Sequence, residues 1–240
     1  FSNLRLAGGG GAAILPSVSA RWQAITGQFI REGYGLSETS PVVAFNPASV
    51  TAFSGSTGLP LPSTDVLLLD DEGHPAPLGQ PGEVCVKGPQ VMGGYWQQPE
   101  ANAAAFTPDG YFRTGDIGQL DERGFLKIVD RKKDMVIVSG FNVFPNEVEA
   151  VATACPGVLE CACIGVPDEK TGEALRLYVV RAAGTAPPVD ADHIAAHCRA
   201  ALTAYKVPRQ IVFVEALPKS SVGKILRRDC LLYTSDAADE

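Results

Sequence analysis

The chain has 240 residues, a formal net charge of −7 and a charged content of 20%. The negative charge argues against nucleic acid as the main partner, because a phosphate backbone requires a basic surface. The hydrophobic content of 45% is ordinary for a globular protein. No apolar run approaches the roughly 20 residues that a membrane-spanning helix needs, and the length suits one large domain or two small ones.

The first half of the chain is predicted to be rich in β-structure. Residues 4–7 are predicted as a strand, which the glycine run 8–11 breaks before a helix; another strand and a loop follow up to residue 45. Glycine, proline and aspartate bound the later elements. The expected strands are 66–69, 82–87 and 124–129, the expected turns are 70–73 and 121–124, and the expected helix is 99–106.

The second half is predicted to alternate strands and helices. A charged cluster at 130–134 interrupts two apolar strands, and we place a domain boundary there. Proline at the first turn favours a helix from Pro145, and Asp190 or Asp192 is expected to cap another helix. The expected strands are 135–138, 161–166, 175–181 and 210–215, and the expected helices are 145–154 and 190–204.

The six cysteines fit no zinc-binding pattern. Cys161 and Cys163 alternate along a predicted strand, so their side chains point to the same face. We therefore expect ordinary buried thiols in a reducing compartment.

Three motifs in the first half carry side chains that suit nucleotide chemistry. The glycine run 8–11 allows a backbone to approach a ligand closely, although a tight turn explains it equally well. In the segment 34–39 a tyrosine ring can stack on a base, a serine can bond a phosphate and a glutamate can hold Mg²⁺; a capped loop is the alternative. Asp116 follows a glycine and can accept ribose hydroxyls, or it lies in a hairpin turn.

Two further motifs lie in the second half. Arg131 is a fixed cation that can bond a ribose or a phosphate, and the segment 139–147 follows it; a solvated linker is the alternative. The segments 205–208 and 218–228 complete the series. In the second of these, Lys224 follows a glycine on a turn of proline, serine and glycine. A lysine on such an exposed loop can enter and leave an active site, unless the loop is only a basic surface turn.

These five motifs, in this order, resemble the C-terminal part of the AMP-forming acyl-activating ligases, the superfamily of acyl-CoA synthetases, peptide-synthetase adenylation domains and beetle luciferases. The resemblance runs from Leu4 to Arg228, and the stretches 82–92 and 128–147 are similar to bacterial long-chain fatty acid–CoA ligases. It implies a mixed α/β (α+β) fold. The implied domains are the end of a large adenylation domain with a β-rich subdomain at 1–130, a small α/β lid domain after a hinge at 131–228, and a non-native or unstructured tail at 229–240.

The resemblance also implies an activity. Such enzymes join a fatty acid to ATP with Mg²⁺, releasing pyrophosphate and forming an acyl-adenylate. Coenzyme A then attacks the acyl carbon, giving acyl-CoA and AMP. The implied location is the cytoplasm, with peripheral contact at the inner face of the membrane.

Roles for individual residues follow from the same resemblance. Glu38 would be catalytic and hold Mg²⁺, Lys224 would be catalytic and reach the α-phosphate, and Lys133 would be the hinge and contact the nucleotide. Gly140 and Phe141 would lie beside the path of the coenzyme A thiol. The residues implied to surround the nucleotide are Gly9, Gly10, Gly11, Tyr34, Gly35, Ser37, Asp116 and Arg131.

Two departures from the superfamily pattern bear on these roles. Ala13 stands where the adenine-side turn usually carries proline, which is a mild change. The Ser/Thr/Gly-rich loop ending in lysine, which binds the outer phosphates, is not among these residues, and the chain begins at Phe1 and leads directly into the predicted strand 4–7. We therefore expect a fragment that is incomplete for catalysis. The alternatives are a ligase for a short- or medium-chain, aromatic or amino acid, and a noncatalytic AMP-binding fragment.

Overall fold

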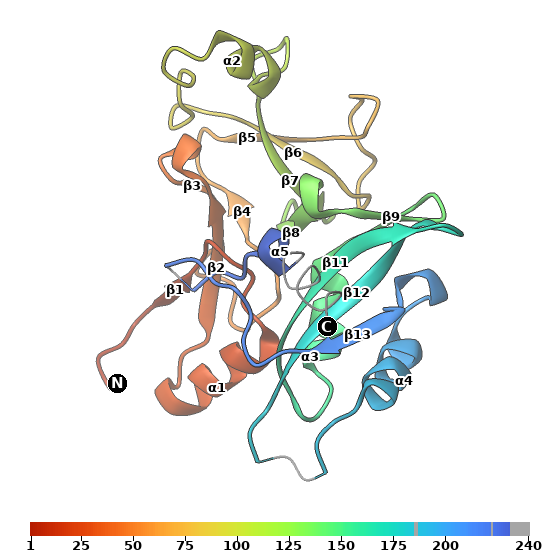
Figure 1. Ribbon diagram of the computed structural model, residues 1–240. Helices are drawn as coiled ribbons and strands as arrows, with labels where there is room; N and C mark the ends of the chain where they lie inside the picture. Colours follow the sequence, from red (N-terminus) through yellow and green to blue (C-terminus); the bar gives the residue numbers. More distant parts are fainter. Residues whose placement is uncertain (185–186, 222, 231–240) are drawn as a thin grey trace. The chain divides into compact units, whose positions relative to one another are not determined.

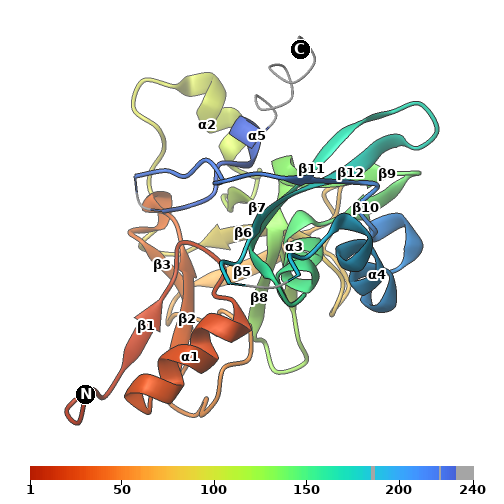
Figure 2. The ribbon, with the colours of Figure 1, turned by 60° about the horizontal axis from the view of Figure 1, so that its bottom comes forward.

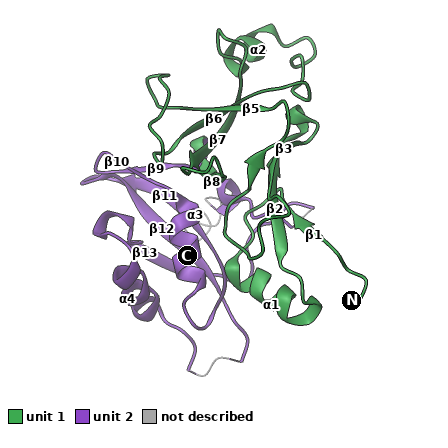
Figure 3. Ribbon diagram, turned by 180° about the vertical axis from the view of Figure 1, so that it is seen from behind, with its two compact units in different colours: residues 1–132 green, residues 133–240 purple. Residues whose placement is uncertain are grey.

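The computed structural model describes residues 1–184, 187–221 and 223–230, and it divides into two compact units, unit 1 at 1–132 and unit 2 at 133–240 (Figure 3). The division falls between Lys132 and Lys133, whereas the sequence placed the boundary after residue 130. The units combine helices with several sheets, so the fold is mixed α/β. Within the described residues, no helix is both long and apolar enough to cross a membrane.

The first sheet of unit 1 follows the order β1-β2-β3-β4. Its strands are β1 (Ala7–Gly9), β2 (Ile30–Gly35), β3 (Val42–Phe45) and β4 (Leu59–Pro60). Helix α1 (Pro16–Thr26) joins the parallel pair β1 and β2, and it lies beside them in both views (Figures 1 and 2). Proline begins this helix, and Gly27 ends it in the left-handed conformation (φ 75°).

The glycine run lies differently from the prediction. The expected strand 4–7 is displaced, because β1 covers Ala7–Gly9 and its residues Gly8 and Gly9 pair with Arg31 and Glu32. The strand therefore ends within the glycine run and not before it. The helix begins only at Pro16. Parallel pairing with β2 supplies the backbone hydrogen bonds that hold these glycines extended, which local propensity does not reveal.

The second sheet of unit 1 is an antiparallel meander in the order β5-β6-β7-β8. Its strands are β5 (Asp65–Leu69), β6 (Gly82–Lys87), β7 (Phe112–Leu120) and β8 (Leu126–Arg131), with α2 (Pro99–Ala105) between β6 and β7. The sequence predicted the other strands and the helix but missed β7. The two sheets share one apolar core of Val43, Ala44, Leu68, Val84, Val86 and Leu126.

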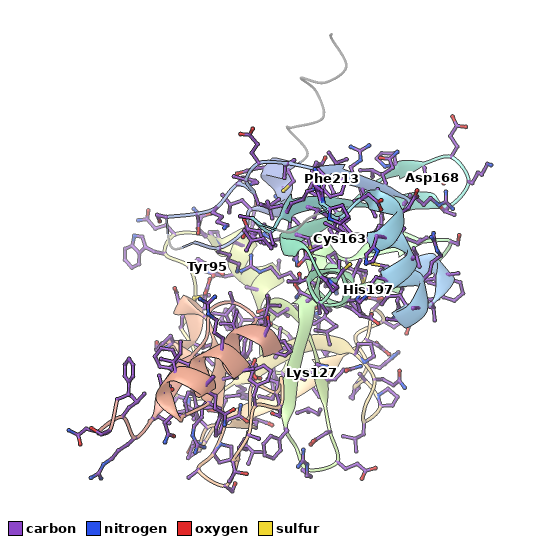
Figure 4. All side chains as sticks on the ribbon, turned by 90° about the horizontal axis from the view of Figure 1, so that it is seen from below. Tyr95, Lys127, Cys163, Asp168, His197 and Phe213 are labelled. Carbon is purple, nitrogen blue, oxygen red and sulfur yellow. The ribbon has the colours of Figure 1, made fainter. Side chains whose placement is uncertain are left out.

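Unit 2 is built on a sheet in the order β10-β9-β12-β11, with β13 parallel to β12. Its strands are β9 (Val136–Val138), β10 (Phe141–Val143), β11 (Val158–Asp168), β12 (Gly172–Arg181) and β13 (Gln210–Phe213). The helices are α3 (Pro145–Thr153), α4 (Ala191–Ala201) and the short α5 (Arg227–Cys230). Strands β11 and β12 form a long hairpin with Asp168 near its tip (Figure 4).

Two apolar clusters lie on opposite sides of the β11–β12 hairpin. The larger one joins alternate strand residues, such as Cys161 and Cys163, to α3 and α4. The smaller one joins the other strand residues to Leu217 and Cys230. All six cysteines are buried free thiols, as predicted, and burial raises the pKa of Cys161 to about 12. Helix α5 extends through Asp229 and Cys230, which the sequence assigned to the tail; the rest of that tail lies outside the described residues.

Asp190 is the cap of α4, because its Oδ1 accepts a hydrogen bond from the backbone N–H of His193 at 2.8 Å. We expect Asp190→Ala to lower the free energy of unfolding by about 1 kcal/mol, since one helix-end donor loses its acceptor. Asp190→Asn keeps an acceptor oxygen and serves as the control. Urea unfolding followed by circular dichroism measures the change, and hydrogen exchange should place it in α4. Equal stability of the two variants would contradict the capping role.

Candidate functional site

A β-bulge in β7 positions Asp116. The pairing of β6 with β7 passes from Glu83↔Ile117 to Cys85↔Arg113, so β7 holds extra residues there. Gly115 takes the left-handed φ of 70° that this bulge requires. The Thr114 hydroxyl donates to the carbonyl of Val84 at 2.8 Å and accepts from the backbone N–H of Asp116 at 3.1 Å. The bulge explains why Asp116 follows a glycine without lying in a hairpin turn.

The Asp116 carboxylate is held between two side chains from different strands. The Tyr34 hydroxyl, from β2, donates to its Oδ2 at 2.6 Å. Arg131 lies opposite Asp116 in the β7–β8 register, and its Nε is 3.9 Å from Oδ1. The side chain of Asp116 is 13% exposed and that of Arg131 is 44% exposed. The sheet register thus places a carboxylate beside a cation that faces solvent.

The tyrosine in this cluster remains a hydrogen-bond donor. Burial, together with the charge of Asp116 and the hydrogen bond to it, raises the pKa of Tyr34 far above its ordinary value. The hydroxyl therefore keeps its proton and fixes one carboxylate oxygen. A carboxylate can accept about four hydrogen bonds, so the Tyr34 hydroxyl uses one of several acceptor positions on Asp116.

The turn after β2 carries Ser37 and Glu38. Gly35 is required at its start, because an added Cβ would lie 1.8 Å from the carbonyl oxygen of Pro41. The Thr39 hydroxyl accepts from the backbone N–H of Leu36 and donates to the carbonyl of Pro41 at 2.7 Å. These contacts close the turn. Ser37 is exposed on it, and Glu38 is half-buried.

Glu38 is tied to the segment that precedes α2. Its backbone carbonyl accepts from the N–H of Met92 at 2.8 Å, and its Oε1 accepts from the Tyr95 hydroxyl at 3.0 Å. Tyr95 is itself exposed at the surface (Figure 4). No sequence motif marks Tyr95 as a partner of Glu38, because the two residues lie 57 positions apart in the chain.

The glycines after β1 lie close to β2. An added Cβ on Gly10 would come within 2.8 Å of the carbonyl oxygen of Gly33, so only glycine allows this approach of the two backbones. Gly11 has a φ of 80° and nothing within 4 Å of an added Cβ. Gly9 belongs to β1, whereas Gly10 and Gly11 are exposed. The glycine run thus borders the strand that carries Tyr34.

The end of unit 1 is anchored by a buried carboxylate. Glu83 of β6 accepts from Arg113 at 3.0 Å and from Lys132 at 3.1 Å, both through Oε2. Lys132 is the last residue of unit 1, and Lys133 follows it in the short turn η2 (Lys132–Asp134). Lys133, the predicted hinge, therefore directly follows Lys132, which is ion-paired with Glu83.

Unit 2 holds the remaining predicted residues. Gly140 lies in the turn between β9 and β10, and Phe141 begins β10. The Phe141 ring is 55% exposed and stacks on Tyr205, with centroids 4.7 Å apart and an interplanar angle of 21°. Next to Tyr205, Lys206 donates to both carboxylate oxygens of Glu147 at 2.8 Å.

Lys224 lies in a closed turn of unit 2. The backbone N–H of Ser220 donates to the Lys224 carbonyl at 2.8 Å, and the N–H of Lys224 donates to the Ser220 hydroxyl at 3.2 Å. Lys219 and Ile225 form an antiparallel bridge across the turn. These contacts close a small hairpin around Lys224, and the ion pair of Lys219 with Glu160 of β11 at 2.6 Å attaches it to the sheet of unit 2.

The comparisons with known proteins cover both units. The sequence matches the AMP-binding enzyme family over residues 1–96 and the AMP-binding enzyme C-terminal domain over residues 147–224. The chain belongs to the AMP-binding enzyme family. This membership confirms the resemblance on which the residue roles were assigned, while the roles themselves stay predictions.

Curated members of this family show high similarity to the chain. It is 52% identical to a long-chain-fatty-acid–CoA ligase of Escherichia coli O6:H1 over 95% of its length and 40% of the relative's. A long-chain-fatty-acid–CoA ligase of Bacillus subtilis is 42% identical over 96% of the chain and 41% of that relative. A feruloyl-CoA synthase of Amycolatopsis sp is 41% identical over 95% and 46%. The chain spans less than half the length of these relatives.

Solved structures of the family resemble this fold. ATP-bound MatB from Rhodopseudomonas palustris matches 98% of the chain with a TM-score of 0.89 and 37% identity, and the chain covers 46% of it. The o-succinylbenzoate CoA synthetase MenE from Bacillus subtilis, in complex with the acyl-adenylate intermediate OSB-AMP, matches 95% with a TM-score of 0.85 and 32% identity; the chain covers 46% of it. These matches confirm the predicted fold class.

Glu32 is a buried carboxyl on the same strand as Tyr34. It is 7% exposed, and burial raises its pKa to about 7, partly offset by the Gly55 N–H and the charge of Lys127. A pKa higher in the folded protein than in the unfolded chain gives stability below about pH 4.5 that is lost as the pH rises through 7. Ionisation of Glu32 thus opposes folding at neutral pH.

We expect Glu32→Gln to be more stable than the parent chain at pH 8, and this advantage should exceed that at pH 5 by about 2 kcal/mol. Both tryptophans, Trp22 and Trp96, lie in unit 1, so urea unfolding followed by tryptophan fluorescence reports on that unit. Glu122→Gln at an exposed position is the control. An advantage that does not change with pH would show that Glu32 is not held protonated by the fold.

Proposed function

We propose that this chain provides the nucleotide-binding end and the lid of an ATP-dependent, AMP-forming long-chain fatty acid–CoA ligase. The observation that carries the proposal is the Asp116 cluster, in which Tyr34 and the more exposed Arg131 hold a partly buried carboxylate of unit 1. The identity of 52% with a long-chain-fatty-acid–CoA ligase supports the substrate class. Fatty acid, ATP and coenzyme A are the proposed substrates.

The nucleotide site is assigned to unit 1. The Asp116 carboxylate would accept the ribose hydroxyls, while Tyr34 and Arg131 fix its orientation. The backbone approach at Gly10 leaves the strand edge beside Tyr34 without side-chain bulk, which suits a flat base. The exposed Ser37 hydroxyl and the turn formed with Gly35 would face the phosphate. Gly9 and Gly11 complete the glycine border.

The residues fit a magnesium ion at one position. Glu38 offers a half-buried carboxylate whose backbone and Oε1 are held by Met92 and Tyr95, and carboxylate oxygens are preferred Mg²⁺ ligands. Mg²⁺ is commonly held by one or two carboxylates together with substrate phosphates and water, so a single protein ligand is sufficient. When bound, the ion would neutralise phosphate charge.

The proposed first reaction joins two anions. A fatty acid carboxylate oxygen attacks the α-phosphorus of ATP, the bond to the bridging oxygen breaks, and pyrophosphate leaves with that electron pair. Repulsion between the carboxylate and the phosphates raises the barrier, so a cation placed at the reacting atoms stabilises the transition state. Lys224 is the proposed cation, and its short hairpin fixes where unit 2 presents it.

The proposed second reaction transfers the acyl group to coenzyme A. The thiol sulfur bonds to the acyl carbon, the bond to AMP breaks, and the thiol proton is released. We assign Gly140 and the exposed Phe141 to the side of unit 2 that meets the thiol path. Rotation of unit 2 about Lys133 would exchange Lys224 for this segment, because the two reactions need different groups beside one adenylate.

A second substrate class has specific support. The feruloyl-CoA synthase is 41% identical to this chain, close to the 42% identity of the Bacillus subtilis long-chain ligase. An aromatic acid is therefore the alternative acyl substrate. A panel of long-chain, medium-chain and aromatic acids distinguishes the two when the complete ligase that carries this sequence is assayed. Activity with aromatic acids alone would overturn the long-chain assignment.

The assays below use a chimeric ligase, in which this chain replaces its matching segment in the Escherichia coli O6:H1 relative. The chimera supplies the remainder of a complete ligase while every residue tested belongs to this chain. A folded chimera that neither binds AMP nor forms acyl-adenylate would overturn the proposed function.

We expect Asp116→Asn in the chimera to weaken AMP binding by about 10- to 100-fold, because a hydrogen bond to a charged acceptor contributes about 1.5–3 kcal/mol. Isothermal titration calorimetry measures the affinity, and Glu122→Gln, in the exposed turn of the β7–β8 hairpin that also carries Asp116, is the matched control. If Asp116 meets the ribose, 2′-deoxy-AMP should bind the parent chimera more weakly than AMP does. The Asn variant should distinguish the two nucleotides less. If the parent and Asp116→Asn chimeras bind AMP with equal affinity, the ribose role of Asp116 is contradicted.

We expect Lys224→Ala in the chimera to slow adenylate formation by at least ~100-fold, by analogy with loss of an oxyanion-stabilising donor. Thioester formation from supplied acyl-adenylate should change far less, because that step needs no cation at the α-phosphate. Rapid-quench assays of pyrophosphate release and of acyl-CoA formation measure the two steps separately. Lys170→Ala, at an exposed position of unit 2, is the control. Equal loss in both steps would contradict the assignment.

A further inference from the structure

Arg227 joins three parts of unit 2 through one side chain. It begins α5 directly after the Lys224 hairpin and is 17% exposed. Its Nε and Nη2 donate to the two carboxylate oxygens of Glu149 at 2.8 and 2.6 Å. Its Nη2 also donates to the Asn146 side chain, and its Nη1 lies 3.4 Å from Asp134 Oδ2.

The partners of Arg227 belong to two structural parts. Asn146 and Glu149 lie on α3, and Glu149 Oε1 also accepts from the backbone N–H of Cys163 at 2.8 Å. Cys163 is fully buried in β11, in the interior of unit 2 (Figure 4). Glu149 is thus held to the sheet as well as to the arginine. Asp134 is the last residue of η2, directly after Lys133.

Backbone contacts connect this arginine to the lysine hairpin. The N–H of Leu226 donates to the carbonyl of Pro218 at 2.9 Å, and Lys219 bridges to Ile225. Ser220 and Lys224 close the hairpin. The described residues 218–221 and 223–227 are therefore joined by hydrogen bonds, and Arg227 provides an ion-paired attachment of this segment to α3 and η2.

We infer that Arg227 is a positioning residue, which fixes the Lys224 hairpin to the hinge turn so that the lysine moves with the hinge as one body. The inference rests on the proposed function, because it assumes that Lys224 acts in adenylate formation and that η2 is the hinge. The hairpin is also held by the ion pair of Lys219 with Glu160 at 2.6 Å and by the packing of Ile225 against the smaller apolar cluster. Arg227 adds the attachment to α3 and η2, and without it the hairpin would take more positions relative to the hinge turn.

The geometry requires arginine at this position. A guanidinium group holds a carboxylate through two parallel hydrogen bonds and still has a third nitrogen for another partner. A lysine at residue 227 would keep the positive charge but could not hold Glu149 and Asp134 in this fork. Arg227→Lys is therefore the informative variant. Arg228→Lys, at the exposed neighbouring position, is its matched control.

The test compares the two half-reactions in the chimeric ligase. We expect Arg227→Lys to slow adenylate formation by about 10- to 100-fold, up to the loss caused by removing the lysine itself. Thioester formation from supplied acyl-adenylate should fall by less than about 3-fold, because that step does not use Lys224. Arg228→Lys should leave both rates at the parent level.

A double variant separates positioning from general destabilisation. If Arg227 acts through Lys224, Arg227→Lys should add almost nothing to the loss already caused by Lys224→Ala. A role confined to holding unit 2 together would slow both half-reactions and add to the Lys224→Ala loss. Equal slowing of both half-reactions would overturn the inference, and so would a loss that adds to that of Lys224→Ala. An Arg227→Lys chimera as active as the Arg228→Lys chimera would also overturn it.

Two further results keep the test decisive. If the Arg227→Lys chimera does not fold, Asp134→Asn is tested in its place, because it weakens only the contact between Arg227 and the hinge turn. This variant should slow adenylate formation more than thioester formation. Rates equal to those of the parent chimera would overturn the inference. A parent chimera that forms no adenylate would instead defeat the proposed function. The two failures are therefore distinguishable.

Discussion

The hydrogen bond from Tyr34 to Asp116 is the interaction on which the proposed nucleotide site of unit 1 depends. It joins a strand of the first sheet to a bulged strand of the second, so the carboxylate is fixed from both sides. The bulge needs Gly115 in a left-handed conformation and the Thr114 hydroxyl as a substitute backbone partner. Burial raises the pKa of Tyr34, so this donor keeps its proton and the contact persists.

In unit 2 the corresponding interaction is the ion pair between Arg227 and the Glu149 carboxylate. Glu149 receives the Arg227 guanidinium and a backbone N–H of the central hairpin, so a partly buried carboxylate is satisfied from both directions. A carboxylate in such a place is tolerated only when it is paired and hydrogen-bonded. The pairing links η2, α3 and the lysine hairpin, which are the parts that the proposed lid would carry together.

These two clusters suit the division of labour that we propose between the units. Unit 1 presents an acidic group and a glycine border, which can bind a nucleoside by hydrogen bonding and by shape. Unit 2 presents a lysine on a short hairpin and an exposed aromatic ring stacked on Tyr205. A reaction in two steps, with opposite needs for a cation, is served by a lid that offers one of these surfaces at a time.

The sequence by itself determined the fold class, the family and most strands and helices, because turn residues, prolines and apolar alternation are local signals. It also singled out Tyr34, Asp116 and Arg131, although their contact stays invisible in the chain. Only the tertiary structure decided that Gly8 and Gly9 are strand residues, that β7 carries a bulge, and that Glu38 meets Tyr95. It also decided the partners of Arg227. Strand register and long-range pairing between charged groups depend on residues far apart in the chain, so no local pattern encodes them.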